Sequence, residues 1–360
     1  MRIAQVAPLF ESVPPVAYGG TERIVSYLTE ELVRLGHEVT LFATGDSVTS
    51  ARLVPICPMG LRLDPNCVDR YAHIVVLVET VFSQIDSFDV VHFHIDYFHF
   101  PLLRRRWMPN LTTLHGRLDI PDLVPLYRTY CEMPVVSISH AQRKPLSWLN
   151  WLGTVYHGLP EDLYRPEFSC GEYLAFLGRI SPEKGVDRAI EIARRAGMPL
   201  KIAAKVDPAD REYYQQKIRP LLREPMVEFL GEIGQKDKNE FLGKAYALLF
   251  PIDWPEPFGL VMIEAMACGT PVIAFRRGSV PEVMEDGVTG WIVEDVEGAV
   301  KAVAKVDRIS RVECRRVFER RFTAERMALD YLNLYQRVTQ ALESRDGLGP
   351  VGPVKVKVAA

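Results

Sequence analysis

Two glutamates, Glu256 and Glu264, lie eight residues apart in a segment that joins a turn to a helix. Glu256 belongs to a turn rich in proline and glycine. Glu264 lies in an apolar stretch typical of a helix that begins near Phe258 or Gly259 and ends at residues 269–271. Backbone N–H groups at a helix N-terminus attract anions, and carboxylates accept hydrogen bonds from hydroxyls, so this order suits a sugar joined to a diphosphate. The alternative is an ordinary helix with one capping and one surface glutamate.

A second segment, residues 176–185, places two cations around a Ser-Pro turn. Its strand ends at Gly178, and Arg179 and Lys184 then precede a helix. Two fixed cations beside a helix start can hold a diphosphate and stabilise it as it departs. As ordinary surface charges they would need no functional explanation, so both interpretations stay open.

The first strand-to-helix junction contains two consecutive glycines, Gly19 and Gly20. Such glycines let the backbone approach a ligand closely, with a phosphate on the helix N-terminus. A plain structural turn is the commoner reason for a Gly-Gly pair. The junction lacks the G-x-G-x-x-G pattern of dinucleotide-binding folds, which disfavours a dehydrogenase.

Polar residues also follow other strands. His115 comes directly after a strand, on the side of the sheet where a cleft is expected, although a lone histidine there is more often structural. His94 and Asp96 end another strand and could contact a second substrate, or form the polar rim of an aromatic core. Ile233 follows a strand of the second half, where backbone groups could hold a base.

Short apolar strands alternate with helical patterns in both halves of the chain, which predicts parallel sheets with helices on both faces. Two of the predicted helices cover residues 21–35 and 186–196. The predicted strands cover residues 3–7, 39–43, 90–94, 111–114 and 135–138 in the first half, and 173–177, 200–204, 227–230, 248–251, 272–275 and 291–293 in the second. The expected fold class is therefore α/β, with two Rossmann-like doubly wound domains that face each other across a substrate cleft.

The expected domain limits follow from the turn-rich segment between the halves. We expect an N-terminal Rossmann-like domain over residues 1–160 and a C-terminal Rossmann-like domain over residues 161–322. Residues 323–343 have the pattern of a long amphipathic helix, and residues 344–360 are expected to be a flexible tail.

The composition of the chain limits the kinds of molecule that it is expected to bind. At 360 residues the chain is long for one core and suits two domains, and a net charge of −3 gives no general attraction to nucleic acid. Scattered cysteines predict thiols in a reducing compartment, with no metal-ligand spacing. The first residues indicate a buried strand rather than a signal peptide, and no apolar run reaches transmembrane length. The expected location is the cytoplasm, with membrane association at most peripheral.

Taken together, these segments resemble the retaining glycosyltransferases of family 4, which share the GT-B fold. The matching phrases run through nearly the whole chain: residues 18–23, 178–185, 256–271 and 281–290. The stretch up to Asp46 is also similar to a subgroup that includes UDP-glucose:tetrahydropterin glucosyltransferases. One departure is visible, because many relatives have Asn-Gly where this chain has His157-Gly158.

The resemblance assigns roles to the residues singled out above. Arg179 and Lys184 would bind the donor diphosphate, Glu256 would accept hydrogen bonds from the sugar, and Glu264 would hold the ribose. His115 would contact the sugar near its 6-hydroxyl. The remaining donor contacts would come from Gly19, Gly20, Ile233, Phe258, Gly259 and Leu260. The final helix would cross back to the first domain.

The reaction implied by the resemblance is transfer of a hexosyl group from a nucleotide sugar with retention of configuration, without a metal or another cofactor. Glucose and UDP-glucose are the expected hexose and donor, and the acceptor is a small molecule, a glycan or a lipid-linked molecule. One alternative is a nucleotide-sugar epimerase or hydrolase on the same frame, with Asp96 or Glu11 as acid or base. Another is a binding module without catalytic activity.

Overall fold

The computed structural model describes residues 1–16 and 19–343, and its first sheet is built from strands of the N-terminal half. This sheet has seven strands in the order β3-β2-β1-β4-β5-β6-β7, and every neighbouring pair is parallel. The central strands β1 and β4 are buried on both faces and are mostly apolar, with Gln5 and His92 as buried polar exceptions. The strands are β1 (Arg2–Val6), β2 (Glu38–Ala43), β3 (Arg52–Pro55), β4 (Val90–Phe93), β5 (Asn110–Thr113), β6 (Val135–Ser137) and β7 (Trp151–Thr154).

The second sheet has six strands in the order β10-β9-β8-β11-β12-β13, again with parallel neighbours throughout. In both sheets the strand order reverses beside the first strand of the half, which is the doubly wound arrangement expected from the sequence. The strands are β8 (Tyr173–Arg179), β9 (Leu200–Lys205), β10 (Val227–Gly231), β11 (Ala245–Phe250), β12 (Val272–Phe275) and β13 (Gly290–Val293).

Two strands of the first sheet, β3 and β7, have no counterpart among the predicted strands. Both lie at the sheet edges and leave their side chains partly exposed. An edge strand needs no continuous apolar run, so its sequence carries little of the signal by which buried strands are recognised.

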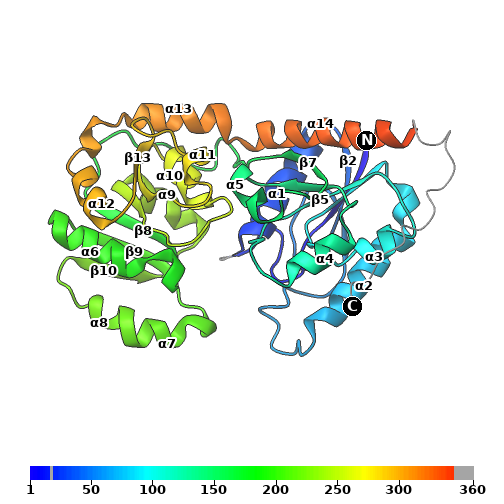
Figure 1. Ribbon diagram of the computed structural model, residues 1–360, viewed down its shortest axis with the longest axis horizontal. Helices are drawn as coiled ribbons and strands as arrows, with labels where there is room; N and C mark the ends of the chain where they lie inside the picture. The colour runs from blue at the N-terminus through cyan, green and yellow to red at the C-terminus, as the bar shows by residue number, and fades with distance from the viewer. Residues whose placement is uncertain (17–18, 344–360) are drawn as a thin grey trace.

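Helices cover both faces of each sheet (Figure 1). Those of the first half are α1 (Gly20–Arg34), α2 (Arg70–Ser83), α3 (Phe100–Leu103), α4 (Leu123–Thr129) and α5 (His140–Arg143). Those of the second half are α6 (Val186–Ala196), α7 (Arg211–Tyr213), α8 (Arg219–Leu221), α9 (Gln235–Gly243), α10 (Leu260–Ala267), α11 (Val280–Val283), α12 (Val296–Val303) and α13 (Arg311–Arg321). Among the described residues, no helix combines the length and apolar character needed to cross a membrane.

The last helix, α14 (Ala324–Glu343), follows α13 along one side of the molecule and lies on the N-terminal domain (Figure 1). Its buried side chains Met327, Tyr331 and Tyr335 share a core cluster with Ile3 and Leu28 of that domain. The chain therefore ends its described part on the domain in which it began. The predicted tail, residues 344–360, and Tyr18 of the first motif lie outside the described residues.

Candidate active site

A cleft with a volume of about 520 Å³ lies between the two domains. Residues from the carboxyl ends of strands in both sheets line it, as expected for open α/β sheets. The structure brings every site residue predicted from the sequence to this one cleft: Gly19, Gly20, His94, Asp96, His115, Arg179, Lys184, Ile233, Glu256, Phe258, Gly259, Leu260 and Glu264. The predicted residues thus share one location, although Gly19 and Glu264 are 245 positions apart in the chain.

Glu256 is largely buried on the donor side of the cleft. Its carboxylate forms an ion pair with Lys184 and accepts a hydrogen bond from the indole Nε1 of Trp254 at 2.9 Å. The ammonium of Lys184 also lies 5.0 Å from the centre of the Trp254 ring. Glu256, which is expected to bind the sugar, and Lys184, which is expected to bind the diphosphate, are therefore direct neighbours.

The loop that carries Glu256 is held by the turn after β12. The backbone N–H of Ser279 donates to the Glu256 carbonyl at 3.0 Å, and the Ser279 hydroxyl donates to the Phe258 carbonyl at 2.8 Å. Gly278 has a φ of 52°, and a Cβ atom there would run into the backbone of Glu256. Close backbone approach thus requires glycine at this position, which the sequence reasoning did not identify.

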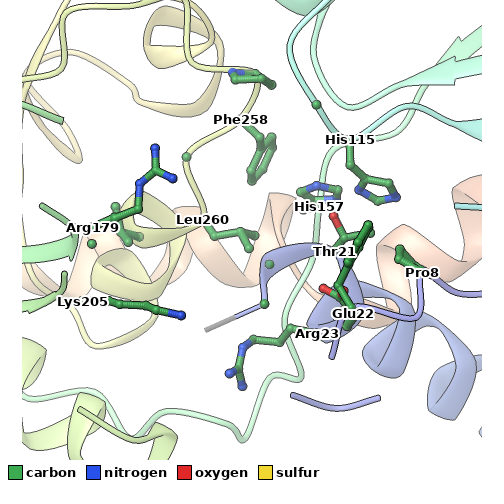
Figure 2. A pocket seen from close by; sticks show the side chains of 18 of the residues that line it. Pro8, Thr21, Glu22, Arg23, His115, His157, Arg179, Lys205, Phe258 and Leu260 are labelled. Atoms are coloured by element: carbon green, nitrogen blue, oxygen red, sulfur yellow. The ribbon is translucent and has the colours of Figure 1, made fainter. Parts of the chain in front are cut away.

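Further cations face the cleft from the C-terminal domain. Arg179, at the end of β8, pairs with Glu183 at 2.7 Å and Asp210 at 3.4 Å. Figure 2 shows Arg179 and Lys205 extending from the same side of the pocket, opposite His115 and His157. Lys205 was missed from the sequence, although its place at the end of the strand beside β8 was a usable signal.

Glu264 lies on α10, with 2% of the residue exposed. It pairs with Lys238 of α9 at 2.7 Å and accepts a hydrogen bond from the Tyr164 hydroxyl at 3.0 Å. Burial alone would raise the pKa of Glu264, but Lys238 and then Arg23 and Tyr164 outweigh it and hold that pKa below its ordinary value. Glu264 is therefore a fixed anion at neutral pH, and Lys238 is a second residue that the sequence reasoning missed.

Two helix N-termini meet in the cleft. Gly19, with a φ of 153°, precedes α1, and Gly259, with a φ of 82°, precedes α10. A Cβ atom on Gly20 would lie 3.5 Å from the Leu260 side chain, so the two helix starts approach closely from opposite domains. Their free N–H groups and helix dipoles favour a shared anion.

Histidines form the opposite wall. The His94 Nδ1 and His115 Nε2 atoms are 2.8 Å apart, and the His94 Nε2 atom is 2.9 Å from the Gln5 side-chain oxygen. Both ring nitrogens of His94 are thus engaged within the protein. The His115 ring stacks on His157 at 5.4 Å, and desolvation lowers the pKa of His115 to about 3, so it is neutral at pH 7.

Asp96 has a φ of 53°. No other non-glycine residue in the described ranges has a positive φ. Such strain is found at functional sites more often than elsewhere. Desolvation by the surrounding cleft raises the pKa of Asp96 to about 6, although the residue itself is exposed at the cleft surface. Glu11, the other acid considered for epimerase chemistry, is buried against Arg62 at 2.8 Å and does not line the cleft.

The chain matches two protein-family models. Residues 18–156 match "Glycosyltransferase Family 4", and residues 167–319 match "Glycosyl transferases group 1". Together these matches take in most of the chain and both walls of the cleft. The chain belongs to glycosyltransferase family 4. It is accordingly a glycosyltransferase of a retaining family that moves a sugar from a nucleotide sugar.

Curated relatives of this glycosyltransferase are named for different reactions. The N-acetyl-alpha-D-glucosaminyl L-malate synthase of Bacillus anthracis is 26% identical over 77% of this chain and 81% of its own. A probable sucrose-phosphate synthase of Thermosipho melanesiensis is 31% identical over 49% of this chain, and the match spans only 44% of that relative's length.

A solved structure, that of HepE from Anabaena in complex with UDP-glucose, has the same fold. It superposes with a TM-score of 0.68 over 96% of this chain and 100% of its own, at 18% identity. The likeness confirms the GT-B arrangement of two Rossmann-like domains. In the part of the chain that the structure describes, no group of three or more His, Cys, Asp or Glu side chains is arranged to hold a metal ion.

Proposed function

We propose that this glycosyltransferase moves a glucosyl group from UDP-glucose to an acceptor hydroxyl. The observation that carries the proposal is the Lys184–Glu256 ion pair, which lies on the cleft beside two converging helix N-termini. A hexose joined to a diphosphate needs this combination of carboxylate, cation and free amides. The choice of UDP-glucose draws on the shared fold of HepE, which was solved with that donor.

The diphosphate would lie between the helix starts at Gly20 and Leu260, with Arg179 and Lys184 on its oxygens. Lys205 extends into the same space and would add a third cation (Figure 2). Fixed cations in a cleft stabilise the negative charge that develops as the nucleoside diphosphate departs. Arg179 and Lys184 are held on the cleft by carboxylate partners and would exchange these for the diphosphate oxygens.

The sugar and the nucleoside would lie on either side of the diphosphate. Glu256 would accept hydrogen bonds from hexose hydroxyls, and His115 would contact the sugar from the opposite domain. Glu264, which the Lys238 ion pair holds in its charged form, would accept hydrogen bonds from the ribose hydroxyls. Ile233 lies on the cleft and would take the base.

Transfer would proceed by front-side attack. The bond between the anomeric carbon and the diphosphate oxygen breaks, the acceptor oxygen bonds to the same face of that carbon, and the departing oxygen takes the acceptor proton. The products are a glucoside and UDP, and atoms and charge balance without an external base. Attack from the same face leaves the anomeric configuration retained.

The acceptor would enter on the side of the N-terminal domain, where Asp96 lies on the cleft. A carboxylate there can orient a hydroxyl toward the sugar, and His94 would act through His115. A small molecule such as a tetrahydropterin, a glycan or a lipid-linked acceptor all remain candidates for this side. A cytoplasmic location stays a prediction.

A screen of nucleotide sugars tests the proposal. UDP-glucose, GDP-glucose and ADP-glucose are each added at one common concentration, about 100 times the dissociation constant of UDP-glucose, at which that donor stabilises the protein by about 2.7 kcal/mol. UDP-glucose should raise the melting temperature most, and UDP release should then accelerate when acceptors are added. Fast sugar conversion without any acceptor would favour an epimerase or hydrolase. Binding without turnover for any acceptor would favour a binding module.

A further inference from the structure

A buried chain of hydrogen bonds connects the C-terminal helix to the cleft. The Gln5 side-chain Nε2 donates to the Tyr335 hydroxyl at 2.9 Å, and the Gln5 oxygen lies 2.9 Å from His94 Nε2. His94 Nδ1 in turn lies 2.8 Å from His115 Nε2. Tyr335 and Gln5 are fully buried and His94 is 3% exposed, whereas His115 reaches the cleft. We call these four residues the Tyr335–His115 chain.

The Tyr335 hydroxyl makes a second hydrogen bond, which begins a side branch. Its hydroxyl lies 2.8 Å from His92 Nδ1, and His92 Nε2 lies 2.7 Å from the Thr113 hydroxyl. Thr113 is bonded to the Tyr331 hydroxyl at 2.9 Å. Apolar side chains would anchor α14 on the first domain at a lower desolvation cost. Helix packing alone therefore does not explain why this many polar groups are buried here.

The positions of the protons follow from the order of donors and acceptors. A neutral histidine has one ring N–H and one bare nitrogen. In the orientation of the Gln5 amide found here, its oxygen must accept a hydrogen bond from the N–H at His94 Nε2, which leaves His94 Nδ1 bare. His115 must then donate from Nε2 to His94, so its own Nδ1 is a bare acceptor.

The bare nitrogen is buried, and the described part of the protein leaves its lone pair unsatisfied. His115 Nδ1 has no hydrogen-bond partner within the described ranges, and His115 lines the cleft where the sugar is proposed to lie. Burial lowers the pKa of both His94 and His115, which keeps both rings neutral and the proton order intact at pH 7.

We propose that Tyr335 is a positioning residue for sugar transfer, which acts through Gln5 and His94 to fix His115 in the tautomer that accepts a hydrogen bond from a donor-sugar hydroxyl. The proposal rests on the proposed function of the cleft. It gives α14 a task beyond packing, because a helix of the chain's C-terminal part then decides which group a sugar must present to His115. A sugar that lacks that hydroxyl would leave a desolvated lone pair unpaired, and the site would discriminate against it.

The first test reads the tautomer in the wild-type protein and uses a variant only to assign the signals. Nitrogen-15 spectra of histidine-labelled protein distinguish a protonated from a bare ring nitrogen, and the His115 signals are assigned by their loss in His115→Gln. In the wild-type protein between pH 6 and 8, His115 should be neutral, with Nε2 protonated and Nδ1 bare. Protonation at Nδ1, or a charged ring at pH 7, would overturn the proposal.

The second test compares two phenol deletions on one helix. Tyr335→Phe removes the hydroxyl that bonds Gln5, whereas Tyr331→Phe removes an equally buried hydroxyl that bonds Thr113 and does not touch Gln5. Each variant is assayed by UDP release from UDP-glucose and from its 6-deoxy analogue, since the 6-hydroxyl is the one expected near His115. Release into water needs no acceptor.

The wild-type protein should prefer UDP-glucose over the 6-deoxy donor by about tenfold, the effect of one well-made hydrogen bond. Tyr335→Phe should reduce this preference by about threefold or more and leave the affinity for UDP unchanged. Tyr331→Phe should keep the preference while its melting temperature falls to a similar extent. Equal preferences in both variants would show that the hydroxyl of Tyr335 serves stability alone.

The two proposals fail in distinguishable ways. If UDP-glucose neither binds the wild-type protein nor yields UDP with any acceptor, the proposed function is wrong, and the tautomer measured by nitrogen-15 spectra still decides whether the Tyr335–His115 chain fixes His115. If the wild-type protein is active but Tyr335→Phe retains its full donor preference, the function stands and the positioning role is wrong.

Discussion

Lys184 and Glu256 form an ion pair on the wall of the cleft, although 72 positions separate them in the chain. The same carboxylate oxygen also accepts the Trp254 indole N–H. The atom expected to bind a sugar hydroxyl is thus occupied before the donor binds. Donor binding would exchange partners, with Lys184 turning to the diphosphate and Glu256 to the hexose. The pair therefore holds both side chains in position on the cleft wall.

Replacing either member of this pair should reduce catalysis. Lys184→Ala and Glu256→Ala should each lower kcat/KM at least tenfold, a loss of about 1.4 kcal/mol of transition-state stabilisation. The exposed pair of Lys244 and Glu240, at 2.6 Å, provides the matched control, and Lys244→Ala should leave the rate unchanged. Steady-state kinetics measure all three. A folded variant of Lys184 or Glu256 with a near-wild-type rate would remove that residue from the mechanism.

Gly278 should be required for the position of Glu256. A methyl group in Gly278→Ala would meet the Glu256 backbone and displace the loop, so we expect turnover to fall at least tenfold, by about 1.4 kcal/mol or more. Gly197→Ala is the control, because Gly197 also has a positive φ, of 67°, but nothing within 4 Å of the added carbon. Both variants carry left-handed strain, and only Gly278→Ala adds the clash. Equal activity in Gly278→Ala and Gly197→Ala would show that a displacement of the loop does not affect catalysis.

The sequence was sufficient for the parts of the fold that bury continuous apolar runs. The predicted helix over residues 186–196 has the bounds of α6, and the strand over residues 272–275 has those of β12. The predicted helix over residues 21–35 differs from α1 by one residue at each end. Buried strands and amphipathic helices carry their periodicity locally, which is why these elements could be found without knowledge of the tertiary structure.

The sequence was not sufficient for contacts between distant segments. Nothing local pairs Lys238 with Glu264, or links Arg23 of the first domain to Gln235 of the second at 3.1 Å. The Tyr335–His115 chain joins residues up to 330 positions apart, and its tyrosines look from the sequence like ordinary core residues of an amphipathic helix. Only the packing of α14 on the first domain brings them to the histidines. Motifs located the cleft, whereas the groups that support its side chains depended on the fold.

Glu264→Gln should destabilise the protein as well as weaken nucleotide binding. It would leave Lys238, whose side chain is 15% exposed, without its counter-charge, and removing one member of a buried pair costs about 3–5 kcal/mol. Urea unfolding measures the change. The double variant Glu264→Gln with Lys238→Met removes both charges and should recover most of the loss. If the double variant is as unstable as Glu264→Gln, the unpaired ammonium is not the cause.

The effect of Glu264 should also depend on pH in a defined direction. Its pKa in the folded state lies below the ordinary value of 4.5, so its contribution is complete above about pH 4.5 and is lost as the pH falls through the lower folded value. The stability difference between wild type and Glu264→Gln should therefore be constant near neutrality and shrink in acid. A difference that grows on acidification would contradict the ion pair.

His157→Asn should make the protein less sensitive to acid. Burial, followed by the charges of His115 and Arg326, holds the pKa of His157 well below 6.5 in the folded state. Above pH 6.5 the ring is neutral in both the folded and unfolded states. Below it the unfolded chain binds a proton that the folded protein cannot, so stability falls by about 1.4 kcal/mol for each pH unit.

Asparagine, the residue that many relatives have at this position, removes the titrating ring from the wall beside Phe258, whose ring centre lies 4.8 Å from that of His157. The free energy of unfolding in urea, measured at pH 7.5, 6.5 and 5.5, should fall less steeply below pH 6.5 for His157→Asn than for the wild type. The other buried histidines, His92, His94 and His99, still titrate in the variant and preserve part of the slope. Parallel curves for the two proteins would mean that His157 is protonated as readily in the folded state as in the unfolded chain.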